Sequence, residues 1–200
     1  QLGQASFNYD AEGQNTAKTD PQGMTNYNWD ARGRLTTVTL PNGQMVNYSY
    51  DALGRRKSRT AGIVTTSFLY DGRDVVRDEI TGGSAVNYLN GLGIDQKLRQ
   101  TAMSGNLYFL QDQLGSTIAL TNDLGGISER RQYEAFGNSA ESMLTRYGFT
   151  GREHDSLTAS IYYRARWYNP YASRFFTEDP LSFDGGAYNF YQYAKYSPVN

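Results

Sequence analysis

A short motif that recurs about every 20 residues is the feature that most constrains how this chain can fold. It reads "YDAEGQ" from Tyr9, "WDARGRL" from Trp29, "YDALGRR" from Tyr50 and "YDGRDVV" from Tyr70, with steps of 20, 21 and 20 residues. The shared pattern is an aromatic residue, Asp, a small residue, a variable position, Gly and a basic or polar residue. A fixed period of this length is typical of stacked supersecondary units, which cannot bury a hydrophobic face alone.

Each copy of the motif predicts a β-hairpin. In "NYSYDALGRRKSR" an alternating strand ends at Tyr50 and meets Asp51-Ala52-Leu53-Gly54, where Asp can close a turn and Gly can adopt a positive φ. A second turn is expected between copies, around Pro21-Gln22-Gly23 and Pro41-Asn42-Gly43. Two turns in about 20 residues leave two strands of about 6 to 7 residues. We predict an all-β fold in which the hairpins pair edge to edge into one antiparallel sheet.

The composition agrees with this fold and excludes several functions. The 17 Tyr, 9 Phe and 2 Trp favour strands and predict an aromatic core whose hydroxyls need partners. The absence of Cys excludes disulfides and thiolate chemistry, and a single His excludes a multi-His metal site. A net charge of −1 gives no basic surface for nucleic acid, and no apolar run approaches the ~20 residues of a membrane span. We expect no cofactor and no metal, and find no signal peptide in this segment.

Beyond Asp71 the period loosens, but further motifs follow in a recognisable order. They are "YFLQDQLGSTIALTNDLG", "YEAFGN", "YGFTGREHD", "IYYRARWYNPYASRFFTEDP" and "GGAYNFYQYAKYSPVN". With the Tyr-Asp repeats they resemble the end of Rhs or YD-repeat proteins, including the Rhs-associated core, and the similar C component of Tc toxin complexes. The resemblance covers essentially the whole chain and is most specific from Phe149 onward.

The resemblance implies a fold and a function. The fold is a continuous, spiralling antiparallel β-sheet of YD hairpins that forms part of a hollow shell, with an inward-turning C-terminal plug. Residues 1–146 would be the shell segment and residues 147–200 the core domain. The shell would enclose a C-terminal toxin, and the core domain would contribute to aspartic-type self-cleavage that frees this cargo. The implied partners are the upstream YD repeats, the toxin cargo of the same polypeptide and a secretion or delivery apparatus, and the implied location is secreted or delivered at the cell surface.

Two residues match the family's catalytic positions. They are Arg166 in "YYRARWYNP" and Asp179 in "FFTEDP". In the family a second Asp follows a segment that reads Asn-Pro-Val-Asn, which corresponds here to "SPVN", Ser197 to Asn200. We therefore expect the second Asp and the scissile bond to lie beyond Asn200. An aspartic dyad needs two carboxylates, one protonated and one acting as a base, so this chain would be at most half of a protease and inactive alone.

Other acids near Asp179 leave alternatives open. Glu178 would point to the opposite face of an extended segment. Asp184 could approach Asp179 if Pro180 to Phe183 form a turn, although a turn residue beside Gly185-Gly186 is the simpler interpretation.

Without the resemblance, Arg166 is interpreted as a structural ion-pair or cation–π group beside Tyr and Trp, and Asp179-Pro180 as a turn dipeptide. The remaining candidates also have structural interpretations. Arg164 and Arg174 are interpreted as shell-surface or strand-pairing groups, and His154 in "GREHD" as a solvated or capping side chain. The evenly spaced Tyr-Asp pairs are interpreted as turn architecture rather than as catalytic groups. An alternative function from another class is a cell-surface or carbohydrate-binding YD module without cargo or protease activity, in which Tyr rings stack on sugars.

Overall fold

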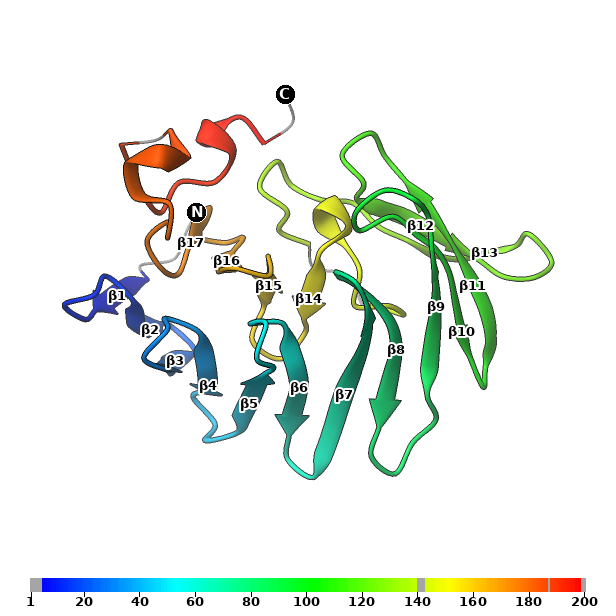
Figure 1. The fold of residues 1–200 in the computed structure, drawn as a ribbon, viewed down its shortest axis with the longest axis horizontal. Coiled ribbons are helices and arrows are strands. Elements are labelled where there is room, and N and C mark those ends of the chain that lie inside the picture. Colours follow the sequence, from blue (N-terminus) through cyan, green and yellow to red (C-terminus); the bar gives the residue numbers. More distant parts are fainter. Residues whose placement is uncertain (1–4, 140–142, 187, 199–200) are drawn as a thin grey trace.

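The computed structural model describes residues 5–139, 143–186 and 188–198, and these form an all-β fold (Figure 1). The first sheet contains β1 Ser6–Tyr9, β2 Asn15–Asp20, β3 Gly23–Trp29, β4 Leu35–Thr39, β5 Met45–Tyr50, β6 Arg56–Ala61, β7 Val64–Asp71, β8 Asp74–Ile80, β9 Val86–Asn90, β10 Lys97–Ala102, β11 Gly105–Gln111, β12 Thr117–Thr121 and β13 Ile127–Arg130. The second contains β14 Glu153–Asp155, β15 Ser160–Tyr162, β16 Trp167–Asn169 and β17 Arg174–Phe175. Three short 3-10 helices are η1 Phe149–Gly151, η2 Ser182–Gly185 and η3 Ala194–Tyr196.

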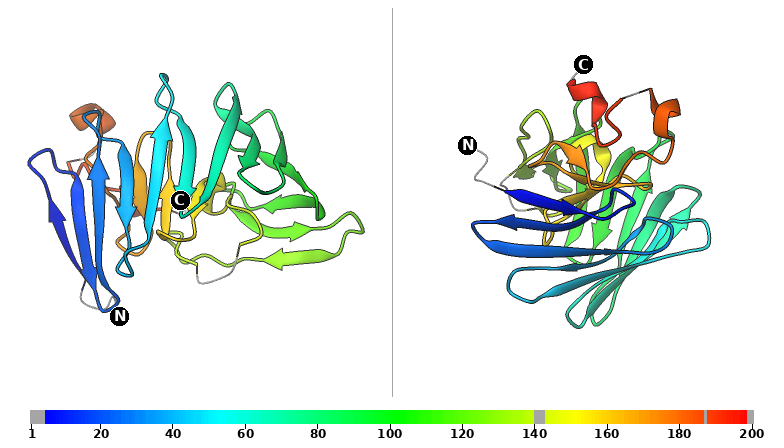
Figure 2. Two further views of the ribbon diagram at one scale, coloured as in Figure 1. Left: turned by 90° about the horizontal axis from the view of Figure 1, so that it is seen from below. Right: turned by 90° about the vertical axis from the view of Figure 1, so that its left-hand side faces the viewer.

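The large sheet is a continuous row of hairpins. Within the described residues its 13 strands follow chain order, and each strand pairs antiparallel with the one before it. Figures 1 and 2 show this sheet curving around the small one. The predicted all-β fold, with one continuing antiparallel sheet and an inward-turning C-terminal plug, is therefore confirmed.

The Tyr-Asp motifs form turns, as predicted. Asp51 accepts the backbone N–H groups of Leu53 and Arg55, both at 2.9 Å, and Gly54 adopts a φ of +80°. Asp10, Asp30 and Asp112 close their turns in the same way. The Asp carboxylate therefore accepts the N–H groups of the turn that have no backbone carbonyl as a partner.

The motif copy at Tyr70 differs from the others. Strand β7 continues through Asp71, which pairs with Asp74 across a turn of two residues, Gly72 and Arg73. Here Gly72 is the first central residue of the turn and has a φ of +57°, as in a type II′ turn, one of the shortest hairpin connections. The copy at Tyr70 therefore makes a shorter turn than the copies before it.

After β13 the chain turns inward onto the concave face of the large sheet. We call residues 144–198, apart from residue 187, the plug. Its Tyr162, Trp167 and Phe176 join sheet residues such as Val38 and Tyr48 in one buried cluster. The rings of Tyr48 and Trp167 lie 4.6 Å apart. The aromatic core predicted from the composition thus joins the sheet to the plug.

A second buried cluster lies under the later strands of the sheet, where Phe68, Tyr88, Phe109 and Leu120 surround Tyr147. A third lies within the plug and contains Phe149, Ile161, Tyr168, Phe175 and Tyr193.

Candidate functional site

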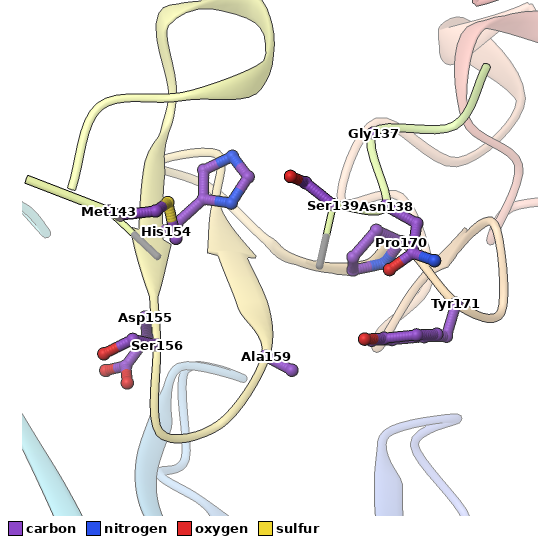
Figure 3. A pocket seen from close by; sticks show the side chains of 10 residues that line it. All are labelled: Gly137, Asn138, Ser139, Met143, His154, Asp155, Ser156, Ala159, Pro170 and Tyr171. Carbon is purple, nitrogen blue, oxygen red and sulfur yellow. The ribbon is translucent and has the colours of Figure 1, made fainter. Parts of the chain in front are cut away.

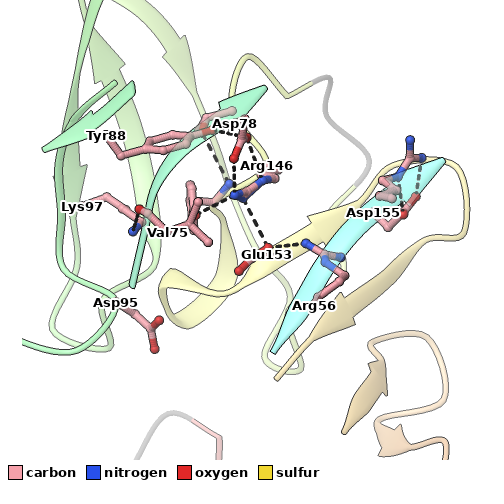
Figure 4. Close-up of polar contacts among 12 residues, drawn as sticks. Arg56, Val75, Asp78, Tyr88, Asp95, Lys97, Arg146, Glu153 and Asp155 are labelled. Carbon is pink, nitrogen blue, oxygen red and sulfur yellow. Dashed lines mark hydrogen bonds and ion pairs between the residues drawn. The ribbon is translucent and has the colours of Figure 1, made fainter. Parts of the chain in front are cut away.

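Buried charges fasten the plug to the sheet (Figure 4). Arg56 of β6 forms an ion pair with Glu153 of β14, and both side chains are buried or nearly so. Arg146 bridges the same Glu153, at 3.2 Å, and Asp78 of β8, at 2.8 Å. Both guanidinium groups stack on the ring of Phe68, at 4.5 and 4.7 Å.

The two acids of this cluster respond differently to burial. Burial raises the pKa of Glu153, but the charges of Arg146 and Arg56 outweigh it and leave the pKa below its usual value. Burial dominates at Asp78 and raises its pKa despite Arg146 and the hydroxyl of Tyr88, which donates to it at 2.8 Å. Each charged group has a partner in the structure, so the cluster orients the plug on the sheet.

The structure brings together the two residues that the sequence singled out. Arg166 Nη2 lies 2.8 Å from Asp179 Oδ2. The Leu181 N–H donates to Asp179 Oδ1 at 3.0 Å, and the Ser182 N–H donates to the Asp179 carbonyl at 2.8 Å. Asp179 therefore begins a tight turn, and each carboxylate oxygen has a fixed donor.

Arg166 is itself held on two sides. Its Nη1 donates to the Phe190 carbonyl at 3.0 Å, and its guanidinium lies 3.7 Å from the centre of the Phe175 ring. Burial is the main reason that the pKa of Arg166 falls below its ordinary value, although the Asp179 charge opposes this shift. The geometry aims the guanidinium at Asp179.

The Arg166–Asp179 pair lines a pocket of about 390 Å³. Its other walls include Phe175, Phe190 and Tyr193. Gly185 lies against the acid, because a Cβ added there would sit 3.2 Å from Asp179 Oδ2. Asp179 is the only carboxylate among the described residues that line this pocket.

The neighbouring acids do not complete a dyad. Glu178 points toward Tyr191, whose hydroxyl lies 3.4 Å from Glu178 Oε1. Asp184 is exposed in η2 and does not line the Asp179 pocket, as the simpler interpretation predicted. Of the "SPVN" segment, Val199 and Asn200 lie outside the described residues.

His154 caps the backbone and is half-buried. Its Nε2 accepts the N–H of Phe149, the first residue of η1, at 2.9 Å. Burial, reinforced by the charge of Arg131, lowers the pKa of His154 to about 3. Of the two interpretations from the sequence, capping is confirmed.

His154 also lines a second pocket, of about 400 Å³, with Asn138, Met143 and Tyr171 (Figure 3). Asp155 lines it too, but its carboxylate is bound by Arg59 and Tyr48 and makes no pair with His154. Among the described residues no cluster of His, Asp or Glu could hold a metal ion. The described part of the chain contains no helix with the length and hydrophobicity needed to span a membrane.

Arg164 and Arg174 contact the sheet from the plug. Arg164 is half-buried and forms an ion pair, at 2.6 Å, with Asp95 in the loop between β9 and β10. Arg174 donates to the hydroxyl of Tyr9 at 3.0 Å and pairs with Asn169 in the small sheet.

The Arg56, Arg146, Asp78 and Glu153 cluster was not predicted. Arg56 precedes Glu153 by 97 positions, and no motif links them. A charged residue on the buried face of a strand, such as Arg56 or Asp78, needs a partner of opposite charge, because an unpaired buried charge is costly. The sequence alone does not identify that partner.

Comparison with known proteins agrees with the fold. Residues 1–199 match the family described as Teneurin YD-shell. The chain is 30% identical over 163 residues to the tRNA3(Ser)-specific nuclease WapA of Bacillus spizizenii, covering 76% of this chain and 7% of that protein. It is 27% identical over 187 residues to the double-stranded DNA deaminase toxin A of Burkholderia cenocepacia, covering 76% of this chain and 13% of that protein.

Solved structures of a Tc toxin share the fold. The TcdB2-TccC3-Cdc42 crystal structure superposes with a TM-score of 0.75 at 22% identity, over 96% of this chain and 10% of that one. The TcdB2-TccC3 crystal structure without the hypervariable C-terminal region gives a TM-score of 0.67 at 18% identity, over 98% of this chain and 13% of that one. The chain thus spans only a small part of the proteins it matches. Because the family match covers nearly every residue, the chain belongs to the Teneurin YD-shell family, as a Rhs-type YD-repeat shell segment similar to Tc toxin components.

Proposed function

We propose that this chain is the closing part of a shell that encloses a toxin carried by the same polypeptide. The large sheet curves around the plug (Figure 2), and this curvature supports a shell whose inner side is the concave face. Relatives named as a tRNA nuclease and a DNA deaminase toxin support a toxic cargo, and the C-terminal region of TccC3 is described as hypervariable. In this proposal residues 1–146 form shell and residues 147–200 form the core domain.

The core domain supplies half of an aspartic protease that separates the cargo from the shell. The observation that carries this proposal is the Arg166–Asp179 ion pair at the wall of a pocket. The second acid comes from the polypeptide that follows this chain. Asp179 accepts a proton from water, the hydroxide adds to the scissile carbonyl, and the second acid protonates the carbonyl oxygen. The C–N bond then breaks as the proton held by Asp179 passes to the leaving amine, and the second acid takes its proton back as the new carboxyl group forms.

Arg166 orients Asp179 for this reaction. It keeps the Asp179 carboxylate in one rotamer, since the guanidinium is anchored to the Phe190 carbonyl and the Phe175 ring. Fixed geometry of this kind lowers the barrier, because the reacting groups need not be ordered at each attempt.

Upstream YD repeats continue the sheet at β1. Among the described residues β1 pairs with β2 alone, so its outer edge has backbone groups ready to pair with a preceding strand. The shell would reach its target from outside the producing cell through a secretion or delivery apparatus, in keeping with the Tc toxin relationship.

The glycan-binding alternative has no support on the inner face. Tyr27, Tyr48 and Tyr88 of the repeats are only 4%, 5% and 9% exposed because they pack against the plug. They cannot stack on a sugar in this arrangement.

A longer polypeptide tests the proposal. It should carry this chain and its natural continuation, and its products should be identified by intact mass and N-terminal sequencing. Asp179→Asn should abolish cleavage, whereas the control Asp184→Asn, five positions away in an exposed turn, should cleave normally. Cleavage that survives Asp179→Asn would refute the protease assignment.

A further inference from the structure

The hairpin β1–β2 touches the segment that carries Asp179. The Tyr191 hydroxyl donates to the carbonyl of Gly13, in the turn between these strands, at 2.6 Å. The same hydroxyl lies 3.4 Å from Oε1 of Glu178, the residue before Asp179. Burial and the Glu178 charge raise the pKa of Tyr191 to about 12, so the hydroxyl stays a donor at neutral pH.

Three more contacts join the hairpin to residues on either side of Asp179. The Asn15 N–H, at the start of β2, donates to the Phe176 carbonyl at 2.9 Å. Arg174 donates to the Tyr9 hydroxyl at 3.0 Å, and the rings of Tyr9 and Tyr191 meet edge to face at 5.5 Å. The hairpin therefore contacts the chain both before and after the turn that contains Asp179.

The same elements hold Arg166. The Phe175 N–H donates to the Tyr191 carbonyl at 2.9 Å, which ties β17 to the segment beyond Asp179. The adjacent Phe190 carbonyl accepts from Arg166. A displacement of Tyr191 would therefore be transmitted to both members of the Arg166–Asp179 pair.

The turn at Gly13 is shaped for this contact. A Cβ added at Gly13 would lie 2.6 Å from the Tyr191 hydroxyl and 2.9 Å from Glu178 Oε1. Gly54 occupies the equivalent position of a later YD turn with a similar positive φ, and a Cβ added there would meet no atom within 4 Å. Both glycines thus adopt a positive φ, but the missing side chain of Gly13 also leaves space for the Tyr191 hydroxyl.

We propose that the hairpin β1–β2 positions Asp179 through Tyr191, so that self-cleavage proceeds only after this shell hairpin has closed on the plug. The inference rests on the proposed protease function and adds its regulation. Cleavage would then be confined to chains whose shell has formed, and an unfolded or half-built shell would keep its cargo attached.

Hydrogen exchange on this chain tests the positioning without any cleavage. Gly13→Ala should increase exchange at the N–H of Asn15, which bonds across the contact, and at the N–H of Phe175, which bonds to the Tyr191 carbonyl. Gly54→Ala imposes the same backbone strain elsewhere and should leave both groups protected. Equal exchange in the two variants would overturn the positioning role.

Cleavage of the longer polypeptide tests the regulation. Gly13→Ala and Tyr191→Phe should slow the first-order cleavage of folded protein about tenfold or more, since small displacements of reacting groups are costly. They should also shift the acid limb of the rate–pH profile, because Asp179 moves relative to Arg166. Gly54→Ala should cleave at the wild-type rate with an unchanged profile.

The outcomes separate the two proposals. Wild-type rates and profiles in Gly13→Ala and Tyr191→Phe would overturn the regulatory inference while the protease function stands. A wild-type polypeptide that stays uncut would refute the protease function and the regulation with it, and hydrogen exchange alone would then decide whether the hairpin positions the Asp179 segment.

Discussion

Arg59 of the large sheet donates two hydrogen bonds to Asp155 of the plug, from Nε to Oδ2 at 2.6 Å and from Nη2 to Oδ1 at 2.9 Å. The Tyr48 hydroxyl adds a third, at 2.6 Å. Burial raises the pKa of Asp155, but Arg59 and Tyr48 together outweigh it and hold the pKa below its usual value. This pair fixes the plug at one position on the sheet.

Breaking this pair should weaken the fold strongly. Asp155→Asn leaves the Arg59 charge without its partner, so we expect a loss of about 3–5 kcal/mol in the free energy of unfolding, measured by urea denaturation. The control Glu79→Gln breaks the exposed Arg77–Glu79 pair and should cost about 1 kcal/mol or less. Similar losses in both variants would contradict the role of Asp155 in anchoring the plug.

The single histidine should make the fold sensitive to mild acid. The folded pKa of His154 is about 3, below the ordinary 6.5, so the unfolded chain binds the extra proton between these values. The stability contributed by neutral His154 is complete above pH 6.5 and falls by about 1.4 kcal/mol per pH unit below it.

Two measurements check this dependence. An NMR titration should show the imidazole still neutral at pH 5 in folded protein. His154→Asn, which keeps an acceptor for the Phe149 N–H, should flatten the stability–pH curve between pH 6.5 and 5. An imidazole that titrates near pH 6.5 in the folded state would contradict the role of neutral His154 as a cap.

The aspartates of the YD turns should be replaceable by asparagine but not by alanine. Asp51→Ala removes the acceptor of two backbone N–H groups and should cost about 1–2 kcal/mol in thermal or urea unfolding. Asp51→Asn should cost less, because Asn122 already closes its turn by accepting from Leu124 and Gly126 at 3.0 and 2.9 Å. Equal losses would show that the charge, rather than the turn acceptor, matters.

The repeat made the large sheet predictable because its turn chemistry is local. Asp51 and Gly54 determine their turn without help from distant residues, and the aromatic residue before each Asp marks the end of a strand. The family resemblance singled out Arg166 and Asp179 separately, and no argument from their spacing predicted that they form an ion pair.

The contacts between sheet and plug could not be predicted. Arg56 meets Glu153, and Arg59 meets Asp155, only because a separate small sheet docks at one position on a curved surface. That position depends on the packing of Tyr48 against Trp167 and similar contacts, which the order of residues along the chain does not reveal.

The full-length polypeptide, which carries the upstream repeats and the natural continuation of this chain, should also show where the cargo goes after cleavage. Its mass should be measured under native and under denaturing conditions. The account predicts one native assembly that contains both fragments and two separate masses after denaturation, because the cut cargo remains enclosed. A single covalent mass under denaturing conditions would contradict self-cleavage, and two fragments that separate under native conditions would contradict enclosure.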